Sequence, residues 1–254
     1  MLSHQFKLNF LLGSYSNNLH YLQQLLDHHQ PMIIVPCSLN DLAYQERATW
    51  QSAYQAVDIC TTDGMPLVYY FRKQQKRGQL ALKNQIERTY GPDLMQDLLK
   101  KDQNHRHFFA GSSQETIRLL SKHLKKHYPQ LLIAGSWSPP LADAKTISHL
   151  LLKKLKKQPV DILWLALSSP KQVKVAQLIK QQLTDNKNSK LKANLKIFCV
   201  GAAFDFIVGS KKQAPLAWRR AGLEWFYRLL QEPRRLAKRY LWDIPVFIVK
   251  KLLF

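Results

Sequence analysis

Short apolar runs alternate along this chain with longer segments in which apolar residues recur at helical spacing. The runs lie at 32–37, 57–61, 107–110, 131–135, 160–167 and 195–202. Each run is apolar throughout rather than at every second position, which is typical of strands buried on both faces. The intervening segments predict helices at 41–56, from about 64, from 91, at 112–128, up to 158 and from 170. This alternation predicts an α/β fold, with a mostly parallel sheet covered by helices on both faces.

The pattern changes at both ends of the chain. An N-terminal strand ahead of Met32 looks degenerate. After about residue 210 the alternation stops, and residues 211–254 carry 11 Lys and Arg against 3 Asp and Glu, with aromatic residues interleaved. The last eleven residues, IPVFIVKKLLF, are apolar apart from two lysines. We therefore expect an α/β domain over 1–210 and a basic, aromatic-rich helical appendage over 211–254.

Charge and cysteine usage narrow the class of partner and compartment. The chain carries 38 Lys and Arg against 17 Asp and Glu, a net charge of +21, which favours nucleic acid, anionic lipid headgroups or phosphorylated substrates. Its three cysteines are an odd number in apolar runs, which suits a reducing compartment. Lys7 and Asn9 interrupt the apolar N-terminal stretch, so we expect no signal peptide. No run approaches the roughly 20 apolar residues that span a bilayer, so we expect a soluble or peripheral protein.

Several motifs of cofactor and metal chemistry are missing from the sequence. It contains no GxGxxG, P-loop, HExxH or GxSxG string, and no Asp-x-Asp pair of the kind that holds a divalent metal in many nucleotide-sugar enzymes. His105 and His107 could bind a metal together, but no Cys or carboxylate follows at ligand spacing, and the pair indicates a solvated loop. We expect neither a bound metal nor a cofactor.

Polar residues follow the apolar runs, at the carboxyl ends where parallel sheets bind ligands. Ser38 and Asn40 follow the first run and suit either a helix cap or contacts to ligand hydroxyls. Thr62, Asp63 and Gly64 follow the second run. Asp63 is a candidate for catalysis or for an N-cap, and Gly64 permits close approach of a substrate.

Three further polar clusters also follow apolar runs or precede helices. Arg88 lies near a predicted helix N-terminus, so that two positive features converge as a phosphate site requires. Gln172 belongs to a polar cluster that begins at Ser168 and leads into a helix. Gly201 and Asp205 belong to a cluster whose small residues allow backbone contact with a ligand.

Taken in order, these clusters resemble the strings of one bacterial family. The chain has TDGMP at 62–66, ERTYGPDL at 87–94, FDFIVG at 204–209, AP at 214–215, GLEWFYRLLQEPRR at 222–235 and KRY at 238–240. They resemble the TagA/WecG/CpsF family, which includes the N-acetylmannosaminyltransferases of cell-wall teichoic acid and enterobacterial common antigen synthesis. The resemblance covers roughly residues 32 to 241, and its C-terminal string is long and highly specific.

The resemblance implies a reaction and a set of roles. It implies a TagA-type α/β fold with Rossmann-like halves and an inverting, metal-independent transfer from a UDP-sugar to a polyprenyl-diphosphate-linked acceptor. The sugar would be N-acetylmannosamine or a related hexose or uronic acid. Asp63 matches the family's proposed base, with Ser38 and Asn40 orienting sugar hydroxyls. The expected substrate-binding residues are Thr62, Gly64, Arg88, Gln172, Gly201, Asp205, Arg228, Arg235 and Arg239.

The resemblance also implies a role for the appendage. It would fold over the active site and touch the membrane. Arg228, Arg235 and Arg239 are spaced by seven and four residues, which would put them on one helical stripe facing the leaving diphosphate. The aromatic and basic composition predicts docking on the inner face of the cell membrane. The alternative is that Val246, Ile248 and Leu252 pack onto the core as an ordinary last helix.

Departures from the family strings keep other functions open. Ser38 replaces a threonine, Ser168 and Ser169 replace Gly-Ala, and Val173 replaces a glutamate. The donor sugar is therefore open, and the loss of the glutamate mildly favours a non-catalytic relative that acts as a scaffold in polysaccharide assembly. A nucleic-acid-binding protein is disfavoured, because no recognised binding motif occurs. The oligomeric state is open, with a homo-oligomer among the alternatives.

Overall fold

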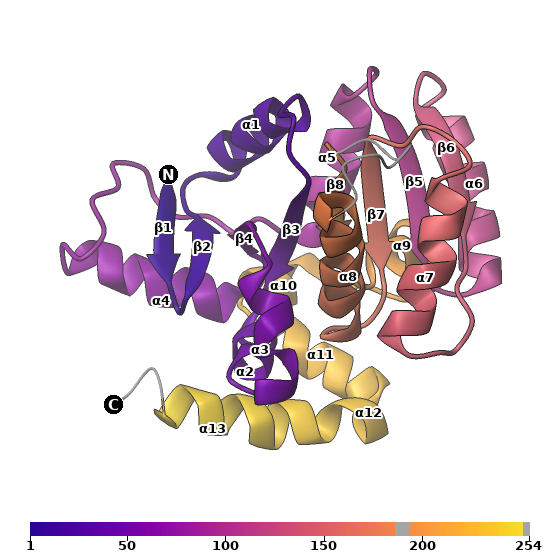
Figure 1. The fold of residues 1–254 in the computed structure, drawn as a ribbon. Helices are drawn as coiled ribbons and strands as arrows, with labels where there is room; N and C mark the ends of the chain where they lie inside the picture. The colour runs from indigo at the N-terminus through magenta and orange to yellow at the C-terminus, as the bar shows by residue number, and fades with distance from the viewer. Residues whose placement is uncertain (186–193, 251–254) are drawn as a thin grey trace.

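A computed structural model describes residues 1–185 and 194–250, and within them the strands form one eight-stranded sheet between helices (Figure 1). The strands are β1 (Leu2–Gln5), β2 (Leu8–Leu11), β3 (Met32–Cys37), β4 (Ile59–Thr62), β5 (Arg106–Gly111), β6 (Leu132–Trp137), β7 (Ile162–Ala166) and β8 (Lys196–Cys199). Their order is β1-β2-β4-β3-β8-β7-β5-β6. Only the β1–β2 pair is antiparallel, so the predicted mostly parallel sheet is confirmed.

Helices cover both faces of the sheet, as the continuous apolar strands predict. One core lies under α2 (Leu39–Gln45), α3 (Ala48–Gln55), α4 (Met65–Lys76), α7 (Ala144–Leu155) and α8 (Lys171–Asp185). The other lies under α1 (Tyr15–Leu26), α5 (Gly91–Lys101), α6 (Gln114–His127) and α9 (Ala203–Ile207). Neighbouring strand residues divide between the cores: Ile33 and Val35 face the first and Ile34 the second. The α/β class is therefore confirmed.

The chain ahead of Met32 is more ordered than its pattern indicates. It forms the β1–β2 hairpin and helix α1, and β2 lies beside β4 in the sheet. The hairpin turn contains Phe6 and Lys7, both at positive φ, 52° and 60°. Such turns usually carry Asn or Gly, so no turn signal stands at these positions, and four-residue strands are too short to show a period.

The single helix expected over 41–56 is two helices. The chain turns at Arg47, whose backbone is extended with φ −88° and ψ 125°. The turn brings α3 back against α2, where the Tyr54 hydroxyl donates a 2.9 Å hydrogen bond to Asp41. A tertiary contact thus overrides a helical period that runs through both segments.

The appendage consists of short helices gathered at one side of the α/β part (Figure 1). They are α10 (Leu216–Arg220), α11 (Glu224–Gln231), α12 (Pro233–Lys238), a π-helical turn η1 (Arg239–Asp243) and α13 (Ile244–Ile248).

The last helix is fixed to the α/β part by apolar and ionic contacts. Phe247 is buried at 6% exposure beside Phe6, and Asp243 pairs with Arg47 at 2.8 Å. Ile248 also packs against the first core, as the alternative of an ordinary last helix predicts, while Leu252 lies outside the described residues. Among the helices described, none combines the length and the apolar character needed to cross a bilayer.

Candidate active site

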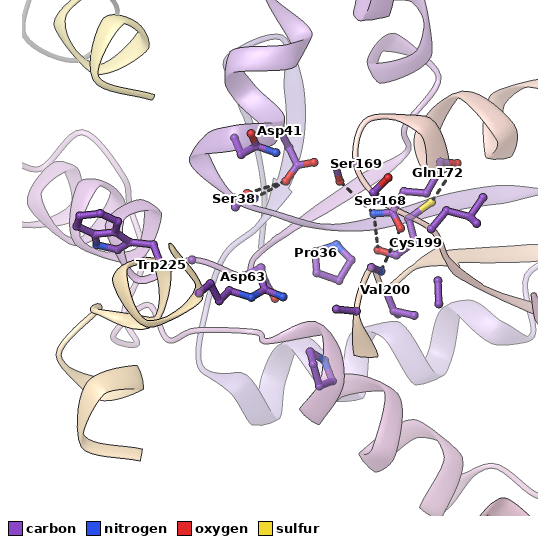
Figure 2. A pocket seen from close by; sticks show the side chains of 18 of the residues that line it. Pro36, Ser38, Asp41, Asp63, Ser168, Ser169, Gln172, Cys199, Val200 and Trp225 are labelled. Atoms are coloured by element: carbon purple, nitrogen blue, oxygen red, sulfur yellow. Dashed lines mark hydrogen bonds between the residues drawn. The ribbon is translucent and has the colours of Figure 1, made fainter. Parts of the chain in front are cut away.

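A cavity of about 960 Å³ lies between the carboxyl ends of the central strands and the appendage. It sits where β3 and β8, the innermost strands of the two halves of the sheet, lie side by side. The strand-end side includes Ser38, Asp63, Ser112, Ser168 and Gly201, and the appendage side includes Glu224, Trp225, Arg228 and Tyr240. Figure 2 shows Ser38 and Asp41 close together, with Ser169 and Gln172 across the pocket and Trp225 on the appendage side.

Asp63 is a carboxylate fixed at the end of β4. Its backbone N–H donates to the Cys37 carbonyl at 2.9 Å, and its Oδ1 accepts a 2.7 Å hydrogen bond from the Gly91 N–H. For Oδ2 no hydrogen-bond partner occurs in the described part of the chain, and this oxygen is not among the buried unpaired atoms. One oxygen therefore holds the side chain while the other stays available to a ligand.

The surroundings of the Asp63 carboxyl raise its pKa above the usual value. Burial raises its pKa to about 6, against the attraction of Arg88, and the charge of Glu224 adds to the rise. The Gly91 N–H and Arg228 oppose the rise. A carboxyl with a pKa near 6 is mostly ionised at neutral pH and is more basic than an ordinary aspartate. Both properties suit a general base.

Arg88 contacts protein groups through Nε, Nη2 and the face of its guanidinium. Nε donates to the Asp63 carbonyl, and Nη2 pairs with Glu224 at 2.6 Å. The group also lies over the Tyr90 ring, 3.9 Å from its centroid, and the Tyr90 hydroxyl donates to Glu224 at 2.9 Å. Arg88 lines the cavity, but its Nε and Nη2 donors bind the protein itself.

Ser38 and Asn40 lie at the end of β3 and differ in what they bind. The Ser38 hydroxyl and N–H both donate to Asp41, at 2.8 and 2.9 Å, in a capping arrangement. Asn40 is only 7% exposed and lines the cavity, and its side chain has no hydrogen bond to any described residue. A nearly buried amide facing a cavity without a partner is well suited to bind a ligand.

Gln172 and Gly201 form one unit. Gln172 is buried, and its Oε1 accepts from the Gly201 N–H at 3.0 Å while Nε2 donates to Ser169 at 3.2 Å. Gly201 has φ 58°, a left-handed backbone in which glycine is unstrained. Both residues line the cavity, and the hydrogen bond from the Gly201 N–H to Gln172 fixes the loop that contains Gly201.

Asp205 and Gly64 also reach the cavity, but Thr62 does not line it. The Asp205 Oδ1 accepts hydrogen bonds from Ser112 at 2.6 Å and from Thr116 at 3.1 Å, which ties α9 to the end of β5. Gly64 precedes α4 with its backbone beside Ser38. Thr62 is fully buried, and its hydroxyl donates to the Glu87 carbonyl at 2.9 Å. It fixes the segment that carries Arg88.

The three appendage arginines do not share one helix, contrary to the sequence prediction. Arg228 lies in α11, Arg235 in α12 and Arg239 in η1. The helix breaks at Glu232 because Pro233 follows it, and the residue before a proline avoids the helical region.

Of these arginines, only Arg228 can be placed at the cavity. It lines the cavity 5.1 Å from the centre of the Phe206 ring, without an ion pair to any described residue. The side chains of Arg235 and Arg239 lie outside the described residues.

The histidine pair lies away from this cavity and is not a solvated loop as expected. His107 is fully buried in β5, where its Nδ1 accepts from the Trp164 indole at 2.9 Å. Asp102 is the carboxylate partner that the spacing did not reveal, at 2.9 Å from His105 and 3.3 Å from His107. In the described ranges, no group of three or more His, Cys, Asp or Glu side chains is arranged to hold a metal.

A comparison with protein families decides the class of this site. The model of the glycosyl transferase WecG/TagA/CpsF family matches residues 4–253. The chain belongs to this family. It is therefore a glycosyltransferase, and the resemblance seen in its strings is confirmed over nearly the whole chain.

Membership in the WecG/TagA/CpsF family also covers parts that the strings did not reach. The match begins within β1 and includes β2 and α13. Sequence reasoning did not single out Glu224 or Tyr90 as site residues, although both lie inside the matched strings. Their signal was present in the motifs, but their contact with Arg88 depends on the fold.

Proposed function

We propose that this glycosyltransferase moves a sugar from a UDP-sugar to a polyprenyl-diphosphate-linked acceptor, with inversion and without a metal, in cell-surface polysaccharide synthesis. N-acetylmannosamine or a related hexose or uronic acid is the proposed sugar. The observation that carries the proposal is Asp63, a carboxylate with one fixed oxygen, one available oxygen and a pKa raised to about 6, beside a 960 Å³ cavity.

The proposed reaction is a single displacement at the anomeric carbon. The acceptor hydroxyl attacks this carbon from the face opposite the leaving UDP, so its oxygen forms the new glycosidic bond as the bond to the diphosphate breaks. Asp63 Oδ2 takes the hydroxyl proton, and the electron pair of the broken bond stays on UDP. Asn40 and Ser38 orient sugar hydroxyls from the end of β3.

The departing diphosphate carries growing negative charge that a cation must offset. Arg228 is a cation on the cavity wall without an ion pair among the described residues, and it faces the strand ends from α11. We therefore assign the diphosphate contact to Arg228. Arg235 and Arg239 remain proposed contributors from the following turns.

The proposed location is the inner face of the cell membrane. The appendage exposes apolar side chains on α10, α11 and η1: Leu216 at 52%, Leu230 at 61%, Leu241 at 63% and Trp242 at 68%. With the basic residues of 211–254, these are the groups that insert into and pair with an anionic lipid surface. A lipid-linked acceptor would reach the cavity from the same surface.

The position whose departure mildly favours the scaffold alternative lies outside the cavity. Val173, which stands where the family string has a glutamate, is fully buried in the first core and does not line the cavity. The departure therefore removes no carboxylate from beside Asp63.

The test supplies candidate UDP-sugars one at a time with a synthetic polyprenyl-diphosphate-linked sugar and an excess of chelator. We expect one donor to be consumed and the anomeric configuration of the product, read by proton NMR, to be inverted. Asp63→Asn is the matched negative control. Retained configuration, or turnover that returns only with added magnesium or manganese, would refute the mechanism. Absence of turnover with every donor would favour the scaffold.

A further inference from the structure

Glu224, the first residue of α11, joins the appendage to the segment that holds Asp63. It accepts from Arg88 Nη2 at 2.6 Å and from the Tyr90 hydroxyl at 2.9 Å, while Arg88 Nε donates to the Asp63 backbone carbonyl. We propose that Glu224 is a positioning residue that fixes α11 against the strand ends and so aligns Arg228 with Asp63 across the cavity. This proposal rests on the proposed function.

The contact is sheltered enough to matter energetically. The Arg88 and Glu224 side chains are 16% and 12% exposed. Exposed ion pairs contribute little to stability, but removing one partner of a sheltered pair leaves an uncompensated charge and is strongly destabilising. Tyr90 is 4% exposed and adds a second hydrogen bond to the same carboxylate. Glu224 is thus held by two neighbours of Asp63 at once.

Besides Glu224, α11 contacts the α/β part through Arg228 over the Phe206 ring, and its aromatic side chains pack on Trp218 and Tyr240 of the appendage. None of its residues is buried, whereas α13 is held separately by Phe247 and by the Asp243–Arg47 pair. Glu224 and Arg228 are four residues apart in α11 and therefore share one face of the helix. The carboxylate at the start of that face sets where the guanidinium one turn later points.

Glu224 also acts on the charge balance around Asp63. The charged and titratable groups that influence the Asp63 carboxyl include Arg88, Tyr90 and Cys37 from the strand-end side and Glu224 and Arg228 from α11. Removing the Glu224 charge takes away a repulsion and leaves two cations, so the Asp63 proton should be lost at lower pH. A merely structural role for Glu224 would not move the pH profile in this way.

The test compares Glu224→Gln with Glu232→Gln in the full chain. Both variants remove one negative charge from the appendage, but Glu232 pairs with Lys211 and does not line the cavity. We expect Glu224→Gln to lower kcat by about 10- to 100-fold and to shift the acidic limb of kcat/KM to lower pH. Glu232→Gln should stay within about twofold. Unchanged kcat and an unchanged pH profile in Glu224→Gln would overturn the proposal.

Two further measurements separate this proposal from the proposed function. In hydrogen exchange, α11 amides of Glu224→Gln should exchange roughly tenfold faster while those of α13 do not change, and this readout needs no activity. In a double-mutant cycle, Arg88→Lys combined with Glu224→Gln should be less harmful than the product of the single effects. Unchanged exchange in α11 refutes the positioning role whether or not transfer is observed. Faster exchange without any transfer refutes only the proposed reaction.

Discussion

The two sides of the cavity are built by different means, as helices α5 and α11 illustrate. α5 buries Leu94, Met95, Leu98 and Leu99 against the sheet. α11 buries no residue and exposes Trp225 at 37%, Phe226 at 39% and Leu230 at 61%. Burial of apolar area stabilises by about 25 cal/mol per Å², so α5 is part of a cooperative core. α11 instead contacts the strand-end side through the polar contacts of Glu224 and through Arg228 over the Phe206 ring.

This difference predicts different consequences for mutations on the two sides. Asp63 and Asn40 lie at strand ends that the core holds rigid, so changes there should alter chemistry without moving the backbone. Arg228 lies on a helix that can shift, so changes near it should alter both chemistry and the order of the appendage. The predictions below test this contrast, beginning with the most severe change.

Removing the whole appendage is the most severe test, because it leaves only the strand-end side of the cavity. Deletion from Lys211 onward should abolish transfer, because the cavity loses Glu224 and Arg228. The α/β part should stay folded, since β8 completes the sheet before the deletion, although exposing the surface under Phe247 should lower its stability. Circular dichroism and product formation check these outcomes. Full transfer by the truncated chain would show that the strand-end side acts alone.

Asp63→Asn tests the strand-end side alone. The substitution keeps an oxygen acceptor for the Gly91 N–H but removes the base, so turnover should fall by about 10²–10⁴ with unchanged donor binding. Initial rates and donor titration by calorimetry measure the two effects. Near-normal turnover in the folded variant would remove Asp63 from the mechanism.

Arg228→Ala tests the appendage side, with Arg234→Ala as its control. Loss of this cavity-lining cation, to which we assign the diphosphate contact, should lower kcat by about 10²–10³. Arg234 lies in the next helix, is exposed and does not line the cavity, so its loss should change kcat by less than about threefold. Equal losses in the two variants would show that only total positive charge matters.

The raised pKa of Asp63 predicts that the ionised carboxylate, which catalysis requires, lowers the stability of the folded protein. Because the folded state binds the Asp63 proton more tightly, the free energy of unfolding should fall as pH rises from about 4 to 6 and stay lower above that range. Asp63→Asn lacks this loss, so it should be more stable than the parent by about 1–3 kcal/mol at pH 7.5, with the difference fading near pH 4. Urea unfolding at several pH values measures it.

The same titration sets the pH dependence of catalysis. Activity requires ionised Asp63, so kcat/KM should fall as pH drops through about 6. An acidic limb near pH 4 would show that burial does not raise the pKa of this carboxyl. If urea unfolding showed the parent to be more stable than Asp63→Asn at pH 7.5, the predicted loss of stability from the ionised carboxylate would be wrong.

The smallest effect concerns the outward face of the appendage. Trp242→Ser should weaken binding to anionic vesicles by about three- to tenfold, because a 68% exposed indole is free to insert. Leu132→Ser on β6, also exposed but remote from the appendage, should leave binding unchanged. Binding of the parent should weaken with salt, since attraction is screened over about 10 Å at 0.1 M ionic strength. Equal vesicle binding by the parent and Trp242→Ser would show that this face of the appendage does not bind the membrane and that the appendage acts in catalysis alone.

Local sequence patterns are enough to predict the central sheet and the strand-end residues. Continuous apolar runs place β3, β4, β5, β7 and β8, and parallel pairing brings their carboxyl ends to one edge. The sequence alone therefore assigns Asp63, Asn40 and Gly201 to one site. The β1–β2 hairpin escapes such patterns, because Phe6 and Lys7 adopt a turn that the fold imposes on residues without a turn preference.

The fold class, the family strings and Asp63 as the candidate base all follow from periodicity and from short motifs that can be read along the chain. Two features depend on the folded chain instead. Arg88 binds Glu224, a residue 136 positions away, and the break before Pro233 places Arg228 in a different helix from Arg235 and Arg239. Strand ends converge by local rules, whereas a pair of side chains so far apart in the sequence depends on the path of every element between its members.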